Sequence, residues 1–288
     1  MGWFSPPPPP PPPPSSLELL VSLLSDEALV HHYAGWVMIL TGACVIFVEV
    51  ILGMRAPYGK HGDIKSAKWY GPTIHPKAAW IFQESWSFLI PAALLLSGTS
   101  DEQCLAAWPN RALLAMYMGH YAYRAFVFPL RMRGGKPMPI GVCLLAACFC
   151  VFNGYLQGRA WTAHAGPITV DSAASSTALI AGATLWALGL FINLHSDAVL
   201  RNLRKPGESG YKIPRGGAFE YVSGANYFGE ILEWCGYAIA SGLSLPAVAF
   251  AFFTFANTAP RAYHHHLWYR EKFDDYPKQR RAVIPYVW

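Results

Sequence analysis

The apolar residues of this chain arrive in long blocks, and this distribution constrains the fold more than any other feature of the sequence. An α-helix needs about 20 apolar residues to cross the hydrocarbon core of a bilayer. Hydrophobic residues make up 53% of the 288 residues and charged residues only 14%, whereas soluble domains average about 25% charged. The sequence therefore predicts an integral membrane protein and excludes a soluble globular one.

The apolar blocks predict an all-α membrane protein with seven transmembrane helices. The predicted spans are 30–54, 77–98, 104–130, 138–158, 173–195, 219–241 and 244–265. The preceding residues, 1–29, contain a run of consecutive prolines from Pro6 to Pro14, which is typical of an extended rod without internal hydrogen bonds. We therefore expect a disordered proline-rich segment at 1–29 and one membrane domain at 30–288.

The loop charges favour this count of spans. Basic residues concentrate in 55–76, 131–137, 196–218 and the tail after 265, and the alternate segments hold only Arg159. Because cytoplasmic loops carry an excess of Lys and Arg, the N-terminus is expected on the lumenal or exterior side and the C-terminus in the cytoplasm. Nucleic acid is not an expected partner, since no zinc finger or RNA-binding signature accompanies the net charge of +5.

Ionisable residues inside predicted spans point to a functional site, because such residues are costly in a membrane. Glu84 lies near the middle of the second span, where a purely structural pairing with Arg or Lys is the alternative. Tyr117, Tyr121 and Arg124 share one face of the third span. The adjacent histidines 264–266 diverge by about 100° each around a helix, so no metal site is expected.

Three polar stripes with helical spacing end toward the predicted cytoplasmic side. They are Asn193, Asp197, Arg201 and Arg204; Asn226, Glu230 and Glu233; and Arg261, His265, Tyr269 and Lys272. Helices that pack together would combine these stripes into a polar cavity open to the cytoplasm. Its mixed charge suits a ligand that carries phosphates and neutral hydrogen-bonding groups.

Several motifs in these regions closely resemble the steroid 5α-reductase family, from about residue 55 to the end of the chain. They include Tyr-Gly-Lys-His (58–61), Ala-Ala-Trp-Ile-Phe-Gln-Glu (78–84), His-Tyr-Ala-Tyr-Arg (120–124), Arg-Gly-Gly-Lys-Pro-Met-Pro (133–139), Asn-Gly-Tyr-Leu-Gln (153–157), Asn-Leu-His-Ser-Asp (193–197) and Ala-Asn-Tyr-Phe-Gly-Glu-Ile-Leu-Glu-Trp (225–234). The resemblance implies a membrane enzyme of the endoplasmic reticulum that uses NADPH, although a bacterial inner membrane would give the same charge pattern.

The resemblance also implies a set of site residues. Glu84 and Tyr121 would hold the 3-keto oxygen of a steroid that enters from the bilayer, and Trp80 and Trp234 would line its apolar slot. The residues implied in NADPH binding are Tyr58, Lys136, Asn193, Asp197, Arg204, Tyr211, Asn226, Glu230, Arg261, His265 and Tyr269. Lys136 is carried over only as a basic residue, because the segment 131–135 departs from some relatives.

The expected reaction is reduction of the C4–C5 double bond of a 3-oxo-Δ4 steroid. A hydride adds to C5, negative charge builds on the ketone oxygen, and Tyr121 with Glu84 stabilises that oxygen. Alternatives with the same fold are reductases of polyprenols, enoyl-CoA or plant-type sterol precursors. A membrane methyltransferase that uses S-adenosylmethionine, and a lipid-binding or scaffold protein without activity, are the alternatives from other classes.

Overall fold

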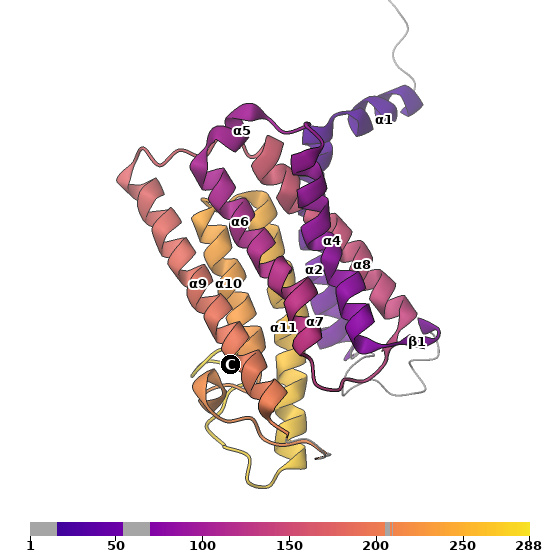
Figure 1. Cartoon of the computed structure of the whole chain (residues 1–288), viewed down its shortest axis with the longest axis vertical. Helices are drawn as coiled ribbons and strands as arrows, with labels where there is room; N and C mark the ends of the chain where they lie inside the picture. The colour runs from indigo at the N-terminus through magenta and orange to yellow at the C-terminus, as the bar shows by residue number, and fades with distance from the viewer. Residues whose placement is uncertain (1–15, 54–69, 205–207, 209) are drawn as a thin grey trace, which may run out of the picture.

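The structure is a computed structural model that describes residues 16–53, 70–204, 208 and 210–288 as a bundle of long helices (Figure 1). The predicted all-helical class is confirmed, since strands in this part of the chain are limited to the pair β1–β2. The helices and strands are α1 (Ser16–Ser25), α2 (Glu27–Ile46), η1 (Phe47–Ile51), β1 (Thr73–Ile74), α4 (Pro76–Leu96), α5 (Glu102–Ala106), α6 (Trp108–Ala122), η4 (Tyr123–Val127), α7 (Phe128–Arg131), β2 (Met138–Pro139), α8 (Ile140–Arg159), η5 (Ala160–His164), α9 (Ala173–Asn202), η6 (Gly217–Glu220), α10 (Ala225–Ala240) and α11 (Leu245–Lys272).

Four helical stretches of the described chain are long and apolar enough to cross a membrane. They are Glu27–Ile51, Pro76–Leu96, Ile140–His164 and Ala173–Asn202. The remaining long helices are shorter or more polar, because α10 has 16 residues and includes Glu230 and Glu233, and α11 ends in a run of basic and histidine residues. The structure thus supports a membrane protein with four candidate spans.

Several helix boundaries differ from those expected from the apolar blocks. The predicted span 104–130 is divided at Ala107, whose extended backbone precedes α6, and Pro109 lies in the first turn of that helix, where a missing N–H is tolerated. The span expected at 219–241 forms its helix only from Ala225. By contrast, α9 and α11 continue for several polar residues beyond their apolar stretches. A helix can extend past the edge of the hydrocarbon core, so the apolar stretch does not set its end.

The N-terminal boundary also differs. Residues 16–25 form α1, and α2 begins at Glu27 with the side chain of Asp26 accepting from the N–H of Leu29. An Asp at this position satisfies a backbone N–H that has no intrahelical partner. The described part of the segment expected to be disordered is therefore helical, and the proline run lies outside the described residues.

Glycines allow α9 and α10 to lie in backbone contact (Figure 1). Gly182 and Gly189 on α9 face Gly236 and Gly229 on α10. A Cβ added to Gly189 would lie 2.6 Å from Glu233 Cα, and one added to Gly229 would lie 2.8 Å from the carbonyl oxygen of Gly189. Small residues of this kind permit close helix approach within membranes, and we call these four residues the glycine seam.

Two further helix pairs form the rest of the bundle. In α8, Gly154 and Gly158 lie against the backbone of α4, at Trp86 and Pro91. The helix α2 packs against α11, where Gly42 meets Phe252. The interior between these pairs is aromatic, and the indole N–H of Trp161 donates to the hydroxyl of Tyr237 at 2.5 Å.

An ion pair closes the end of the bundle that carries α5, which we call the α5 end. Arg159, which is 6% exposed, donates to both carboxylate oxygens of Glu27 and to the carbonyl oxygen of Thr99. These contacts join the start of α2, the end of α8 and the turn after α4. The α5 end is therefore held by hydrogen bonds among three helices.

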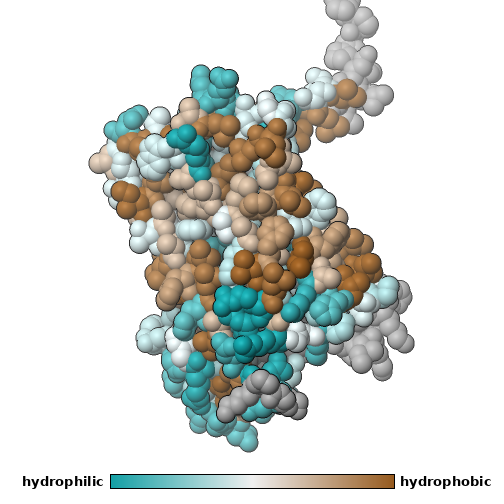
Figure 2. All heavy atoms as spheres, viewed as in Figure 1, coloured by the Kyte–Doolittle hydropathy of each residue, from teal (hydrophilic) through white to brown (hydrophobic). Residues whose placement is uncertain are grey.

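The opposite end, where the C-terminus lies, is formed by the segment before α10 and the tail after α11 (Figure 1). Buried Arg280 donates to the carbonyl oxygen of Pro214 at 2.8 Å and pairs with Glu220 at 3.6 Å. The N–H of Gly216 and the guanidinium of Arg280 lower the pKa of Glu220. We call this end of the bundle the C-terminal end. Figure 2 shows hydrophilic residues gathered toward it, below a broad apolar area.

The glycine seam generates a stability prediction. Gly189→Ala should lower the free energy of unfolding by about 1–3 kcal/mol, because the new methyl group has to push α9 and α10 apart. Thermal unfolding of the detergent-solubilised protein measures this as a lower Tm. The matched control is Gly119→Ala in α6, where an added Cβ meets nothing within 4 Å. Equal Tm values for the two variants would contradict the packing described here.

Candidate active site

The polar stripes of α9 and α10 meet below the glycine seam. The side-chain amide of Asn193 donates to the backbone carbonyl of Asn226 at 3.0 Å. Asn193 and Asp197 are 3% and 6% exposed. The two stripes expected to converge are therefore brought together, and they form one wall of a buried polar cluster.

Arg124 connects this wall to α4. Its guanidinium donates to Asp197 at 3.1 Å and lies 4.7 Å from the ring centre of Trp80 and 4.5 Å from that of Phe128. Stacking against aromatic faces stabilises a desolvated cation. Trp80, which the family resemblance placed in the steroid slot, thus contacts the guanidinium of Arg124 in this structure.

A second buried pair lies one helical turn away. Nδ1 of His120 and a carboxylate oxygen of Glu233 are 2.7 Å apart, and both residues are almost fully buried. Trp234 is completely buried, with its ring 4.8 Å from that of His120 and stacked 6.2 Å from that of Tyr121. Trp234 therefore lies beside Tyr121.

Glu84 faces the same interior from α4. Its two carboxylate oxygens accept from the side-chain amide of Gln83 at 3.3 Å and from the thiol of Cys150 at 3.8 Å. Both of these donors are neutral. Glu84 lies within electrostatic range of the Tyr121 hydroxyl and of Arg124. The described contacts do not include a direct ion pair for Glu84, so the purely structural pairing considered from the sequence is not found among them.

The Tyr121 hydroxyl has a partner on α8. The side-chain amide nitrogen of Asn153 donates to it at 3.5 Å, and Asn153 accepts in turn from Gln157. All three side chains are buried. Tyr121 and Glu84 therefore lie in one interior region, formed by α4, α6, α8 and α10.

Other implied cofactor residues lie nearer the C-terminal end. Arg204 is exposed and donates to the carbonyl oxygen of Gly210, and Tyr211 packs its ring against Trp268. Tyr269 stacks on Tyr276, and His265 packs against Tyr227 of α10. These contacts join the segment before α10 and the tail after α11 to the helices α10 and α11. Tyr58 lies outside the described residues.

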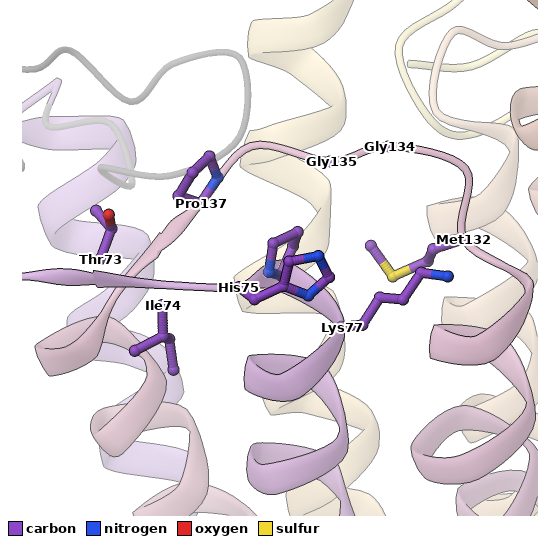
Figure 3. A pocket seen from close by; sticks show the side chains of 9 residues that line it. Thr73, Ile74, His75, Lys77, Met132, Gly134, Gly135 and Pro137 are labelled. Carbon is purple, nitrogen blue, oxygen red and sulfur yellow. The ribbon is translucent and has the colours of Figure 1, made fainter.

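Lys136 is exposed on the connection between α7 and β2. Its neighbours Gly135 and Pro137 line a cavity of about 360 Å³, together with His75 and Lys77 at the start of α4 (Figure 3). Lys77 donates to the carbonyl oxygen of Leu130. The structure does not place Lys136 against the polar cluster of α9 and α10.

The adjacent histidines of α11 face different neighbours. His265 packs against Tyr227, and Nδ1 of His266 lies 2.7 Å from the hydroxyl of Ser223. Across the residues that the structure describes, no group of three or more His, Cys, Asp or Glu side chains is placed to hold a metal ion.

In the part of α9 beyond Gly189, two buried polar atoms have no hydrogen-bond partner within the described chain. They are the hydroxyl oxygen of Ser196 and Nη1 of Arg201, which lies one helical turn beyond Asp197. A buried guanidinium nitrogen without an acceptor is costly unless a ligand supplies one. This side of α9 thus has donors suited to phosphate or hydroxyl oxygens, as a dinucleotide carries.

Sequence reasoning named Arg124, Arg201, His120 and Glu233 but did not include them among the site residues. It gave no role to Asn153 and Gln157. The useful signal for this last pair is their spacing of four within an apolar helix, which places two amides on one face. The pairing of Arg124 with Asp197 could not be found from spacing, because it joins different helices.

Comparisons with known proteins show the family of this chain. Residues 136–288 match the sequence profile of the family described as 3-oxo-5-alpha-steroid 4-dehydrogenase. The chain is 48% identical to 3-oxo-5-alpha-steroid 4-dehydrogenase 1 of Bos taurus, over 85% of this chain and 91% of that relative. It is 48% identical to the type 1 protein of Homo sapiens, over 80% of this chain and 85% of the relative.

The type 2 protein of Homo sapiens is 42% identical, over 87% of this chain and 93% of its own length. These matches cover nearly the whole of each relative and include the segments that carry Glu84, Tyr121 and the α9 and α10 stripes. The family implied by the sequence motifs is thereby confirmed. The chain belongs to the 3-oxo-5-alpha-steroid 4-dehydrogenase family.

Proposed function

We propose that this protein reduces the C4–C5 double bond of 3-oxo-Δ4 steroids to 5α-dihydro steroids, using NADPH. The observation that carries the proposal is the placement of half-buried Glu84 and buried Tyr121 in one interior region, next to the polar cluster of α9 and α10. The names of the relatives favour a steroid over a polyprenol or an enoyl-CoA.

The chemistry requires a donor at the ketone oxygen. When C5 of the enone is reduced, negative charge develops on the 3-oxygen, and a hydrogen bond aimed at that oxygen lowers the barrier by a few kcal/mol. Tyr121 is proposed to donate this hydrogen bond. Glu84 supports it from α4, with Gln83 and Cys150 as neutral donors to its carboxylate oxygens.

The polar cluster is proposed to hold the cofactor. NADPH supplies a hydride when bound. Asn193, Asp197, Asn226 and Glu230 present amide and carboxylate groups suited to its ribose and nicotinamide ends, while Arg201 offers a buried donor for an anionic oxygen. The other members of the proposed cofactor set are Tyr58, Lys136, Arg204, Tyr211, Arg261, His265 and Tyr269.

The steroid is proposed to lie among aromatic rings. Trp234 is stacked near Tyr121 and packs 4.3 Å from the ring centre of Phe250. Rings of this size give a flat apolar ligand a large contact area. Trp80 contributes from the other side of Arg124, where it holds the guanidinium in place.

The membrane arrangement is also a proposal. The enzyme is proposed to lie in the membrane of the endoplasmic reticulum. Seven helical spans, with the N-terminus in the lumen, would place the C-terminal end in the cytoplasm. This end carries the basic loops and the proposed cofactor residues. Cytosolic NADPH and membrane-dissolved steroid would then reach the site from different phases.

The first test uses the two proposed catalytic residues. Glu84→Gln and Tyr121→Phe should each lower kcat by about 10²–10³-fold with testosterone, because each change weakens stabilisation of the ketone oxygen. NADPH oxidation by the detergent-solubilised protein measures the rate, and mass spectrometry identifies the product. Wild-type kcat and KM in both variants would contradict the assignment.

The second test concerns the cofactor. Arg201→Gln should raise the KM for NADPH by about 10-fold or more, since a hydrogen bond between charged groups contributes about 1.5–3 kcal/mol. Arg270→Gln, at an exposed position of α11, is the matched control and should leave this KM unchanged. Retention of S-adenosylmethionine in place of NADPH by the wild-type protein would instead indicate a methyltransferase.

A third test addresses orientation. A glycosylation acceptor inserted after Gly166, at the α5 end, should be modified in microsomes, and the same insertion after Gly134 should not. Loops rich in Arg and Lys are retained on the cytoplasmic side, and Gly134 lies in such a loop. The shift in electrophoretic mobility is the readout. Modification only after Gly134 would reverse the proposed orientation.

A further inference from the structure

Two buried amides connect the Tyr121 hydroxyl to the backbone of α11. The side-chain nitrogen of Gln157 donates to the carbonyl oxygen of Pro246 at 2.8 Å and to the side-chain oxygen of Asn153 at 3.3 Å. The side-chain nitrogen of Asn153 then lies 3.5 Å from the Tyr121 hydroxyl oxygen. Asn153 and Gln157 are both 0% exposed, so water does not compete for these contacts.

The backbone carbonyl sets the direction of every hydrogen bond in this row. The carbonyl oxygen of Pro246 can only accept, so the Gln157 atom that faces it must be the nitrogen. That nitrogen has a second hydrogen, which requires an acceptor and therefore the oxygen of Asn153. The nitrogen of Asn153 is then left facing Tyr121.

The hydroxyl of Tyr121 consequently accepts a hydrogen bond from Asn153. A phenol oxygen that accepts from one side keeps its own proton for the other side. In this arrangement the oxygen of Gln157 has no hydrogen-bond partner among the described residues. With the amides reversed, two oxygens would face each other at Pro246.

We propose that Asn153 and Gln157 are positioning residues that make the Tyr121 hydroxyl a hydrogen-bond donor toward substrate. The inference rests on the proposed function, in which Tyr121 donates to the ketone oxygen. Neither amide touches the ketone in this scheme. Their effect on the reaction passes through the direction of the Tyr121 hydroxyl alone.

Gln157→Glu tests the direction with little change in shape. One nitrogen of Gln157 donates to two acceptors, whereas a carboxylic acid has one proton and a carboxylate has none. The Pro246 carbonyl can only accept, so it takes the one proton of the acid, and in either state residue 157 offers Asn153 an acceptor in place of a donor. Asn153 then turns its nitrogen toward residue 157 and presents its oxygen to Tyr121. The hydroxyl then donates to Asn153 in place of the ketone.

The expected result is a loss of roughly 10-fold in kcat for Gln157→Glu, with the KM for NADPH unchanged. In a Tyr121→Phe background the same substitution should cause no further loss, because its target is already absent. A role in folding alone would lower kcat by the same factor in both backgrounds, and that result would overturn the proposal. Wild-type kcat in Gln157→Glu would overturn it as well.

Asn110→Asp is the matched control. Asn110 is also 0% exposed, and its nitrogen donates to the carbonyl oxygen of Gly166 at 2.9 Å. It lies at the start of α6, and the acid replaces the same kind of donation to a carbonyl. This control should lower Tm while kcat stays at the wild-type value.

A second variant covers the case in which Gln157→Glu does not fold. Asn153→Leu removes the donor to Tyr121 with a side chain of similar size, and it should lower kcat several-fold only when Tyr121 is present. The two levels of proposal fail differently. Wild-type kcat in Tyr121→Phe overturns the proposed site. A low kcat in Tyr121→Phe together with wild-type kcat in Asn153→Leu overturns only the positioning role of Asn153 and Gln157.

Discussion

The glycine seam between α9 and α10 is the packing on which the site depends. Apolar burial drives little association between helices in a membrane, and close backbone approach at small residues takes its place. The contact at Gly189 and Gly229 brings the polar stripes of the two helices into register. Asn193 thereby reaches the backbone of Asn226, and the carboxylate of Asp197 is buried where Arg124, from another helix, pairs with it.

That balance comes from the helix formed by α6 and η4, which follow each other without a break. A buried charge that loses its partner costs about 3–5 kcal/mol, so Arg124–Asp197, from η4, and His120–Glu233, from α6, tie this helix to both helices of the seam. Trp80 and Phe128 pack against the guanidinium of Arg124. The same helix carries Tyr121, and the position of the proposed catalytic hydroxyl is thus linked to the charges at the proposed cofactor site.

The helical class, the four candidate spans and the polar stripes of α9 and α10 could be predicted, because they depend on periodicity along single helices. The partners of Arg124, Tyr121 and Glu233 could not, since each contact depends on how one helix is rotated against another. The start of α6 was also missed, because Cys104 to Ala107 is as apolar as the span that follows. Motif resemblance located Glu84 and Tyr121, while the roles of both stay predictions.

The π-helical turn η4, at Tyr123–Val127, has a consequence for how this helix can change. Such a turn holds one residue more than an α-helical turn, and successive residues of a regular helix are about 100° apart. Loss of any one residue here would restore regular geometry yet swing the two halves of the helix out of alignment, with Tyr121 above the turn and Phe128 below it. The orientation of Tyr121 relative to Phe128 therefore depends on the number of residues in η4. Family members should accept substitutions in η4 far better than insertions or deletions.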